Sequence, residues 1–314
     1  MAVAFTFPGQ GSQQVGMGKE LADQFAAARN VFAEVDEALG ENLSKIMWEG
    51  PDETLTLTAN AQPALMAVSL AVVRVLAEEG VTPAQHARFV AGHSLGEYSA
   101  LAAAGAISLA DTARLLRLRG AAMQRAVAPG DGAMAALLGL DFAQAVEVAA
   151  EAAQGEICQA ANDNAPGQVV VSGAKAAVER AIEIAKGKGA RRAMLLPVSA
   201  PFHCALMATA ADAMADALAQ TEIRPPAVPL VCNILAKPIT DPSEIRGRLV
   251  EQVTGTVRWR ESVAYMAGQG ITSLYELGAG KVLSGLAKRI VSDINAVSVG
   301  TPADVAAALA ALKN

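Results

Sequence analysis

The chain has 314 residues, of which 53% are hydrophobic and 18% charged, and its formal net charge is −6. This composition excludes general disorder, because a chain of this length and apolarity buries a substantial core. The negative charge argues against general affinity for nucleic acid or for an anionic membrane. With only 3 cysteines the chain cannot build a disulfide framework, so we expect free thiols and a cytoplasmic protein.

Neither an export signal nor a membrane span is expected. No basic residue precedes the apolar segment Met1–Phe7, whereas a secretory signal needs a charged region there. The longest uncharged stretch, Thr54–Val73, is long enough to cross a bilayer. Because Asn60 and Pro63 interrupt it, we expect only Ala64–Val73 to form an apolar helix, buried in the core.

Short apolar runs typical of buried strands alternate with longer segments of helical periodicity, which predicts an α/β fold with a largely parallel sheet. The first strand, Val3–Phe7, is followed by a helix over Lys19–Leu39 that ends at a glycine. A second strand, Phe89–Ala91, leads directly into a helix over Leu95–Ala104. Later strands are expected at Pro229–Cys232, Ser273–Leu277 and Ala296–Val299.

The middle of the chain has a different order of elements. After the turn-rich residues 128–132, the pattern predicts the βαββαβ order of a ferredoxin-like unit, with a turn over Asn162–Gly167 between its central strands. We therefore expect an inserted subdomain at 128–198 in a large α/β domain formed by 1–127 and 199–314. The predicted elements of the insert are strand Ala133–Gly139, helix Phe142–Ala153, strands Ile157–Ala161 and Gln168–Ser172, helix Ala174–Lys186 and strand Ala193–Val198.

Ser94 is the candidate nucleophile. The segment Gly92-His93-Ser94-Leu95-Gly96 matches the G-x-S-x-G pattern between a predicted strand and a predicted helix. A sharp turn in that context exposes the serine hydroxyl and leaves the N-terminal amides of the helix beside it. The alternative is an ordinary turn in which the serine caps the helix.

A serine nucleophile needs a base, and the chain has 3 histidines. His86 lies in a polar stretch that predicts an exposed side chain. His93 is adjacent to Ser94, and neighbouring side chains on a sharp turn diverge, so we expect it to pack or to act indirectly. His203 follows a predicted strand, at the sheet edge where α/β folds bind ligands, and is the best candidate for general base. A purely structural role for His203 is the alternative.

Two further features could bind a substrate. Gln10 lies in a glycine-flanked loop that matches neither a dinucleotide fingerprint nor a Walker A loop, and it either aims a backbone amide at an oxyanion or forms a tight turn. Arg119 falls on the more apolar side of a helix, where a buried guanidinium needs a substrate carboxylate or an internal ion pair. No Cys/His cluster has zinc-ligand spacing, so no metal is predicted.

Taken together, the motifs resemble those of the malonyl-CoA:acyl carrier protein transacylases. The resemblance extends from Phe5 to about Ile290. It implies an α/β-hydrolase-like large domain with an inserted ferredoxin-like subdomain, in agreement with the predicted elements. The motifs that carry it are Phe7-Pro8-Gly9-Gln10-Gly11-Ser12-Gln13, Gly92-His93-Ser94-Leu95-Gly96-Glu97-Tyr98, Arg119-Gly120, Asn164-Ala165-Pro166-Gly167-Gln168 and Pro201-Phe202-His203-Cys204.

The resemblance implies a reaction in two half-reactions that supplies fatty acid synthesis. Ser94 attacks the thioester of malonyl-CoA while His203 takes its proton, which gives a malonyl-serine ester. The phosphopantetheine thiol of acyl carrier protein then attacks that ester. No cofactor is implied beyond the coenzyme A thioester, which is the substrate.

The resemblance also implies roles for residues around Ser94. The backbone amides of Gln10 and Leu95 are implied to hold the oxyanion, and Arg119 to pair with the malonyl carboxylate. A backbone carbonyl orients the histidine in this family, and Gln252 is the matching position. The following segment, Val253–Trp259, lacks a proline that family members often carry.

Two other functions stay open at this point. A serine hydrolase has no need of a carboxylate partner such as Arg119. A non-catalytic protein that binds carrier protein or coenzyme A would have no reason to keep serine, histidine and arginine together. We expect a monomer that docks the acidic carrier protein on a basic patch, with Lys186, Lys188, Arg191 and Arg192 as its candidate residues.

Overall fold

The structure is a computed structural model that describes residues 2–313. Its strands are β1 Val3–Phe7, β2 Phe89–Gly92, β3 Gly132–Leu138, β4 Cys158–Ala165, β5 Gln168–Ala174, β6 Arg192–Leu195, β7 Leu230–Val231, β8 Pro238–Ile239, β9 Ser273–Leu277 and β10 Asn295–Val299. Its helices are α1 Lys19–Gln24, α2 Ala26–Leu39, α3 Leu43–Glu49, α4 Asp52–Thr56, α5 Thr58–Glu78, α6 Pro83–His86, α7 Leu95–Ala103, α8 Leu109–Arg125, α9 Phe142–Ala153, α10 Lys175–Gly187, the 3₁₀ turn η1 Ala205–Met207, α11 Ala208–Ala219, α12 Pro242–Thr254, α13 Trp259–Gly268, α14 Val282–Ile290 and α15 Pro302–Leu312.

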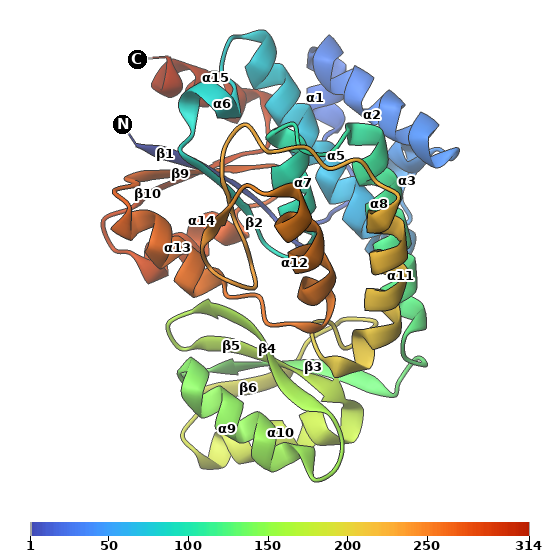
Figure 1. Ribbon diagram of the computed structural model, residues 1–314, viewed down its shortest axis with the longest axis vertical. Coiled ribbons are helices and arrows are strands. Elements are labelled where there is room, and N and C mark those ends of the chain that lie inside the picture. Colours follow the sequence, from blue (N-terminus) through green and yellow to red (C-terminus); the bar gives the residue numbers. More distant parts are fainter. Residues whose placement is uncertain (1, 314) are drawn as a thin grey trace.

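The larger lobe is built on a six-stranded sheet in the order β10-β9-β1-β2-β7-β8 (Figure 1). All neighbouring strands run parallel except β7 and β8, which confirms the predicted α/β fold with a largely parallel sheet. Both faces of the central strand β1 are buried. Val3, Phe5 and Phe7 join the core that contains α2, α5, α7 and α8, whereas Ala4 joins the core under α13 and α14. The carboxyl ends of β1 and β2 therefore emerge together from the interior.

Helix α5 lies in the first of these cores. It is long and apolar enough to span a membrane, but 89% of its most apolar window is buried inside the protein. The predicted buried helix Ala64–Val73 is thus part of a longer one, which also includes Asn60 and Gln62. Their polar groups have partners, because Asn60 donates to the Thr54 carbonyl and Gln62 accepts from Arg119.

The prediction of a single helix over Lys19–Leu39 is wrong in one respect. The chain is extended at Phe25, with φ −120° and ψ 124°, so that the segment forms the two helices α1 and α2. Apolar periodicity persists across the break, which is why the pattern does not reveal it. The guanidinium of Arg29 donates to the Ala22 carbonyl and stabilises the end of α1 that the break leaves open.

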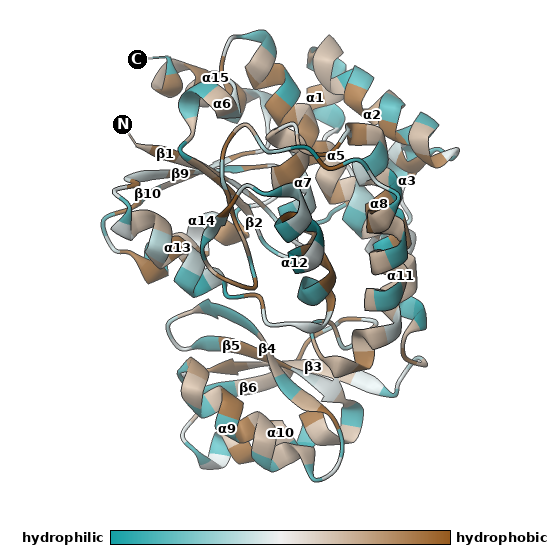
Figure 2. Ribbon diagram, viewed as in Figure 1, coloured by the Kyte–Doolittle hydropathy of each residue, from teal (hydrophilic) through white to brown (hydrophobic). Residues whose placement is uncertain are grey.

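The smaller lobe has the βαββαβ order of a ferredoxin-like unit and lies within 128–198. Its four-stranded antiparallel sheet has the order β4-β5-β3-β6, and α9 and α10 pack on its outer face (Figure 1). Both helices carry hydrophobic and hydrophilic bands, as a helix on a sheet should (Figure 2). The turn expected over Asn162–Gly167 is shorter, because β4 continues through two irregularities to Ala165.

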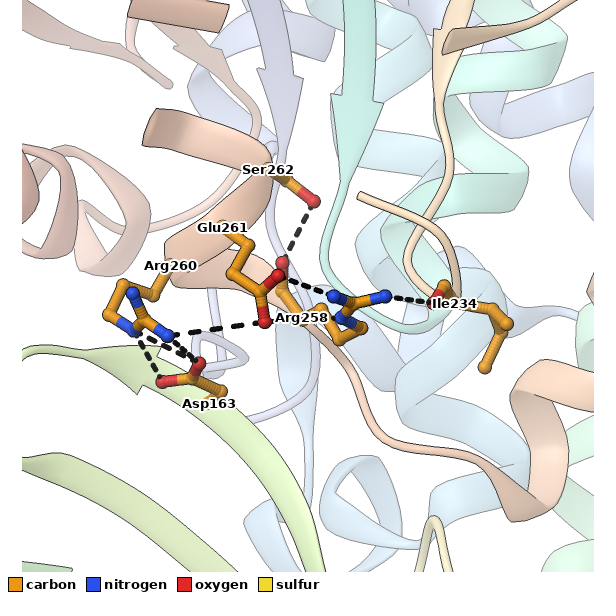
Figure 3. Close-up of polar contacts among 6 residues, drawn as sticks. All are labelled: Asp163, Ile234, Arg258, Arg260, Glu261 and Ser262. Carbon is orange, nitrogen blue, oxygen red and sulfur yellow. Dashed lines mark hydrogen bonds and ion pairs between the residues drawn. The ribbon is translucent and has the colours of Figure 1, made fainter. Parts of the chain in front are cut away.

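The extra length of β4 joins the two lobes. The Asp163 N–H donates to the Val257 carbonyl, 2.9 Å away, and the Val257 N–H donates to Ala161 at 2.9 Å. The buried carboxylate of Asp163 accepts from Arg260 of α13, with an Nη2 distance of 2.8 Å (Figure 3). On the same side Glu261 pairs with Arg258, whose guanidinium donates to the Ile234 carbonyl (Figure 3). The small lobe is therefore attached to the large lobe at Val257 and at α13.

Replacing Arg260 by alanine should weaken this attachment, because it leaves the Asp163 carboxylate buried without a cation. We expect the free energy of unfolding to fall by about 1–3 kcal/mol in denaturant titrations. The matched control is Arg224→Ala, which removes an ion pair with Glu222 whose side chains are 67% and 69% exposed. That control should change stability much less, because water and salt screen an exposed ion pair. Equal losses in the two variants would contradict the role of the Asp163 pair.

Candidate active site

Ser94 lies on a sharp turn between β2 and α7, as its pattern predicts. Its backbone has φ 53° and ψ −111°, a conformation that costs a non-glycine residue energy. The turn is possible because Gly96 has no side chain: a Cβ there would lie 2.2 Å from the Phe7 carbonyl oxygen. The Ser94 N–H donates to Oδ1 of Asn233 at 2.9 Å, which holds the turn from the segment that follows the neighbouring strand β7.

His203 faces this serine. Its Nε2 lies 2.8 Å from Ser94 Oγ, and its Nδ1 lies 2.8 Å from the backbone oxygen of Gln252. A carbonyl only accepts hydrogen bonds, so Nδ1 carries the proton and Nε2 is free to accept from the hydroxyl. Burial, together with the nearby Arg119, lowers the pKa of His203 to about 3. The imidazole is therefore neutral near neutral pH.

Arg119 of α8 is 1% exposed and brings a positive charge to the nucleophile. Its Nη2 donates to Ser94 Oγ at 3.1 Å and to Oε1 of Gln252 at 2.8 Å. Within residues 2–313 no carboxylate forms an ion pair with it, so the internal salt bridge left open by the sequence is absent. Gly120 allows α8 to approach α5 closely, since a Cβ there would lie 2.4 Å from the Thr58 carbonyl oxygen.

Gln10 and Leu95 lie on either side of the serine turn. Gln10 follows β1, and its side-chain amide donates to the Thr58 hydroxyl at 3.3 Å. Leu95 is the first residue of α7, where helix N–H groups have no intrahelical acceptor. Within residues 2–313, the backbone N–H of neither residue donates to another protein group. Both amides are thus available to an oxyanion.

The other two histidines lie apart from this chemistry. His93 turns away from His203: its Nε2 lies 2.8 Å from Oδ1 of Asn164, on β4 of the small lobe, and its ring packs against Trp259 at 5.8 Å. This is the packing role that its place beside the nucleophile predicts. His86 interacts with Thr82 at the start of α6.

Sequence reasoning missed the polar groups behind Arg119 and His203. Gln62, Glu97 and Asn233 are buried there, and Gln252 contributes its side chain as well as the predicted carbonyl. The only available signal was the spacing Ser94-x-x-Glu97. That spacing matches a capping box, in which the glutamate would bond the backbone of Ser94. Instead, Glu97 accepts from Asn233 and Gln252.

Replacing His203 by asparagine should make stability less dependent on pH. Folded His203 stays neutral down to about pH 3, whereas an unfolded histidine binds a proton below about pH 6.5, so acidification favours the unfolded chain. The free energy of unfolding of the wild type should fall more steeply between these pH values than that of His203→Asn. Asparagine is the suitable replacement, because it tolerates the φ of 58° and can donate to the Gln252 carbonyl.

Denaturant titrations at several pH values measure this difference. Parallel pH curves for the two proteins would show that His203 titrates in the folded state as it does in the unfolded one.

The comparisons with known proteins agree on one family. The family model described as "Acyl transferase domain" matches residues 4–284. Among curated proteins, the malonyl CoA-acyl carrier protein transacylase of Escherichia coli (strain K12) is 49% identical over 307 residues, which are 98% of each chain. The protein of the same name from Bacillus subtilis (strain 168) is 46% identical over 312 residues, 99% of this chain and 97% of that one.

Solved structures give the same result. An acyl-carrier-protein-S-malonyltransferase from Bartonella henselae is 58% identical, with a TM-score of 0.98 and full coverage of both chains. A type II PKS acyl-carrier protein in complex with its malonyl-transacylase contains a chain that is 44% identical, with a TM-score of 0.96 and coverage of 99% of this chain and 100% of that one. The similarity therefore extends over both lobes.

Proposed function

The chain belongs to the acyl transferase family, and we propose that it transfers a malonyl group from coenzyme A to the phosphopantetheine thiol of acyl carrier protein in fatty acid synthesis. The observation that carries this proposal is the arginine beside the nucleophile. Arg119 Nη2 lies 3.1 Å from Ser94 Oγ, and within residues 2–313 Arg119 forms no ion pair with a carboxylate. A malonyl thioester carries its carboxylate close to the reacting carbonyl, so it supplies the anion that Arg119 lacks.

In the first half-reaction the Ser94 hydroxyl attacks the thioester carbonyl and gives its proton to Nε2 of His203. The oxyanion forms beside the backbone amides of Gln10 and Leu95. When the tetrahedral intermediate collapses, the C–S bond breaks, and the coenzyme A sulfur leaves with the proton from His203. The product is a malonyl ester of Ser94.

The second half-reaction is the reverse of the first with a different thiol. The phosphopantetheine thiol gives its proton to His203 and attacks the ester carbonyl. As the C–O bond breaks, His203 returns the proton to Ser94 Oγ. Throughout, the Gln252 carbonyl holds Nδ1–H, so that Nε2 faces the reacting atoms. A carbonyl does this without adding a second negative charge near the malonyl carboxylate.

The finer properties of the protein belong to the same proposal. We expect it to act as a cytoplasmic monomer. We also expect no metal or further cofactor, because serine, histidine and arginine suffice for acyl transfer between thiols. Within the predicted docking patch, Lys186 and Lys188 already form ion pairs with Glu183 and Glu151. The exposed Arg191 and Arg192 are therefore the stronger candidates for contact with the acidic carrier protein, and this docking surface stays a prediction.

Replacing Ser94 by alanine should abolish the covalent intermediate. Intact-protein mass spectrometry after brief exposure to malonyl-CoA should show a malonyl adduct on the wild type, mapped to Ser94 and discharged by carrier protein. The variant should show none. Malonate released without carrier protein would instead indicate a hydrolase. A protein that forms no adduct and does not turn over malonyl-CoA would indicate a binding role only.

Replacing Arg119 by alanine should change substrate preference. The variant loses the cation for the malonyl carboxylate, so acylation by malonyl-CoA should fall by about 100-fold or more. Acylation by acetyl-CoA, which has no carboxylate, should fall less or rise. Initial rates with the two thioesters measure the malonyl-to-acetyl ratio. An unchanged ratio would remove Arg119 from the substrate site.

A further inference from the structure

Glu97 is a buried carboxylate beside the reacting groups to which the mechanism above assigns no role. It lies on α7, one turn after Ser94, and is 1% exposed. Its two oxygens have different partners. Oε1 accepts from the backbone N–H of Asn233 at 3.1 Å, and Oε2 accepts from the side-chain amide of Gln252 at 2.5 Å.

Both partners of Glu97 contact the reacting groups. Oδ1 of Asn233 accepts from the Ser94 N–H at 2.9 Å. Gln252 has three such contacts: its side-chain NH₂ donates to the Ser94 carbonyl at 2.9 Å, its side-chain Oε1 accepts from Arg119 at 2.8 Å, and its backbone oxygen accepts from His203 Nδ1 at 2.8 Å. Glu97 thus lies directly behind the residues that hold the nucleophile Ser94, the base His203 and the cation Arg119.

The two ends of the Gln252 side-chain amide are not equivalent in this setting. Its NH₂ end can only donate and its oxygen can only accept, whereas the Glu97 carboxylate can only accept and the Arg119 guanidinium can only donate. The observed orientation satisfies both neighbours. The reversed amide would place oxygen against oxygen at Glu97 and donor against donor at Arg119, and each contact would be repulsive in a buried site.

We propose that Glu97 is a positioning residue: as the charged acceptor beside the Ser94 carbonyl and Asn233 Oδ1, it fixes the orientation of the Gln252 amide and so holds Arg119 where it pairs with the malonyl carboxylate. This inference rests on the proposed function. It assigns Glu97 to substrate preference, through Gln252 and Arg119, and no contact with the substrate is required.

Replacing Glu97 by glutamine tests the proposal with almost no change in shape. An amide has one acceptor oxygen, so it can satisfy Asn233 or Gln252 but not both. The NH₂ of Gln252 then loses its charged acceptor and keeps only the Ser94 carbonyl and Asn233 Oδ1, so Gln252 holds Arg119 less firmly. We expect the malonyl-to-acetyl ratio of Ser94 acylation rates to fall by about fivefold or more, because one buried hydrogen bond at Arg119 is lost.

The matched control is Glu276→Gln. Glu276 is also 1% exposed, and it accepts from the N–H groups of Leu283 and Ser284 at the start of α14, at 3.0 Å and 2.7 Å. Its substitution removes the same charge from a comparable buried setting outside the site. Thermal stability should fall, whereas the malonyl-to-acetyl ratio should not change. A loss of folded protein lowers both acylation rates together and leaves their ratio unaltered.

The pH dependence of the wild type provides a second readout. A protonated Glu97 has one acceptor and one donor, as glutamine has, and burial raises the pKa of Glu97 to about 7. The charged and titratable groups that face it are Arg119, Tyr98 and Cys232. Arg119 stays protonated at these pH values, burial raises the pKa of Tyr98 to about 12, and burial also raises the pKa of Cys232. The wild-type ratio should therefore fall from about pH 8 to about pH 6, and the Glu97→Gln ratio should stay constant.

Each outcome decides one question. If Glu97→Gln does not fold, Glu97→Asp replaces it: aspartate keeps both acceptor oxygens but is one methylene too short to reach both donors, so its ratio should also fall. A folded Glu97 variant with the wild-type ratio, or a wild-type ratio independent of pH, would overturn the role of Glu97. A wild type that forms no malonyl adduct on Ser94 would overturn the proposed function instead.

Discussion

The buried positive charge of Arg119 beside Ser94 is the constraint on which the rest of the site depends. A guanidinium that is 1% exposed has lost its hydration, and the amide oxygens of Gln62 and Gln252 replace water without neutralising the charge. Within residues 2–313 no ion pair balances this charge. In the proposed function the substrate carboxylate pairs with Arg119, and that requirement distinguishes the chemistry of this serine from that of a general esterase.

The same charge affects the base. Burial and Arg119 together keep His203 neutral, which is the state that can accept the serine proton. In the proposed mechanism a malonyl carboxylate pairs with Arg119 and offsets the field of the guanidinium at His203, so that protonation of the imidazole becomes easier as the reaction needs it. Substrate recognition and acid–base chemistry are thus coupled through one cation. An acyl group without a carboxylate lacks this coupling.

The two lobes contribute unequally to the site. The large lobe supplies Ser94, Arg119, His203 and Gln252, whereas the small lobe reaches it through one strand, β4. Consecutive residues of β4 contact the large lobe: Asp163 pairs with Arg260, and Asn164 meets His93 next to the nucleophile. The two irregularities in β4 allow these neighbours to face the large lobe while the strand remains paired with β5.

The sequence by itself determined the fold class, the order of elements in the small lobe and the separate candidates Ser94, His203, Arg119 and Gln10, because periodicity and the strand–turn–helix pattern are local properties. Leu95 and the Gln252 carbonyl came from family resemblance. Local patterns missed the break at Phe25 and the full length of β4, since backbone conformation there depends on contacts with distant segments. Only the tertiary structure decided that Arg119 forms no ion pair among the described residues 2–313, and that Glu97 contacts Asn233 and Gln252. Glu97 lies more than a hundred positions along the chain from both Asn233 and Gln252. A buried polar group takes whichever partners the packing of several elements brings within reach.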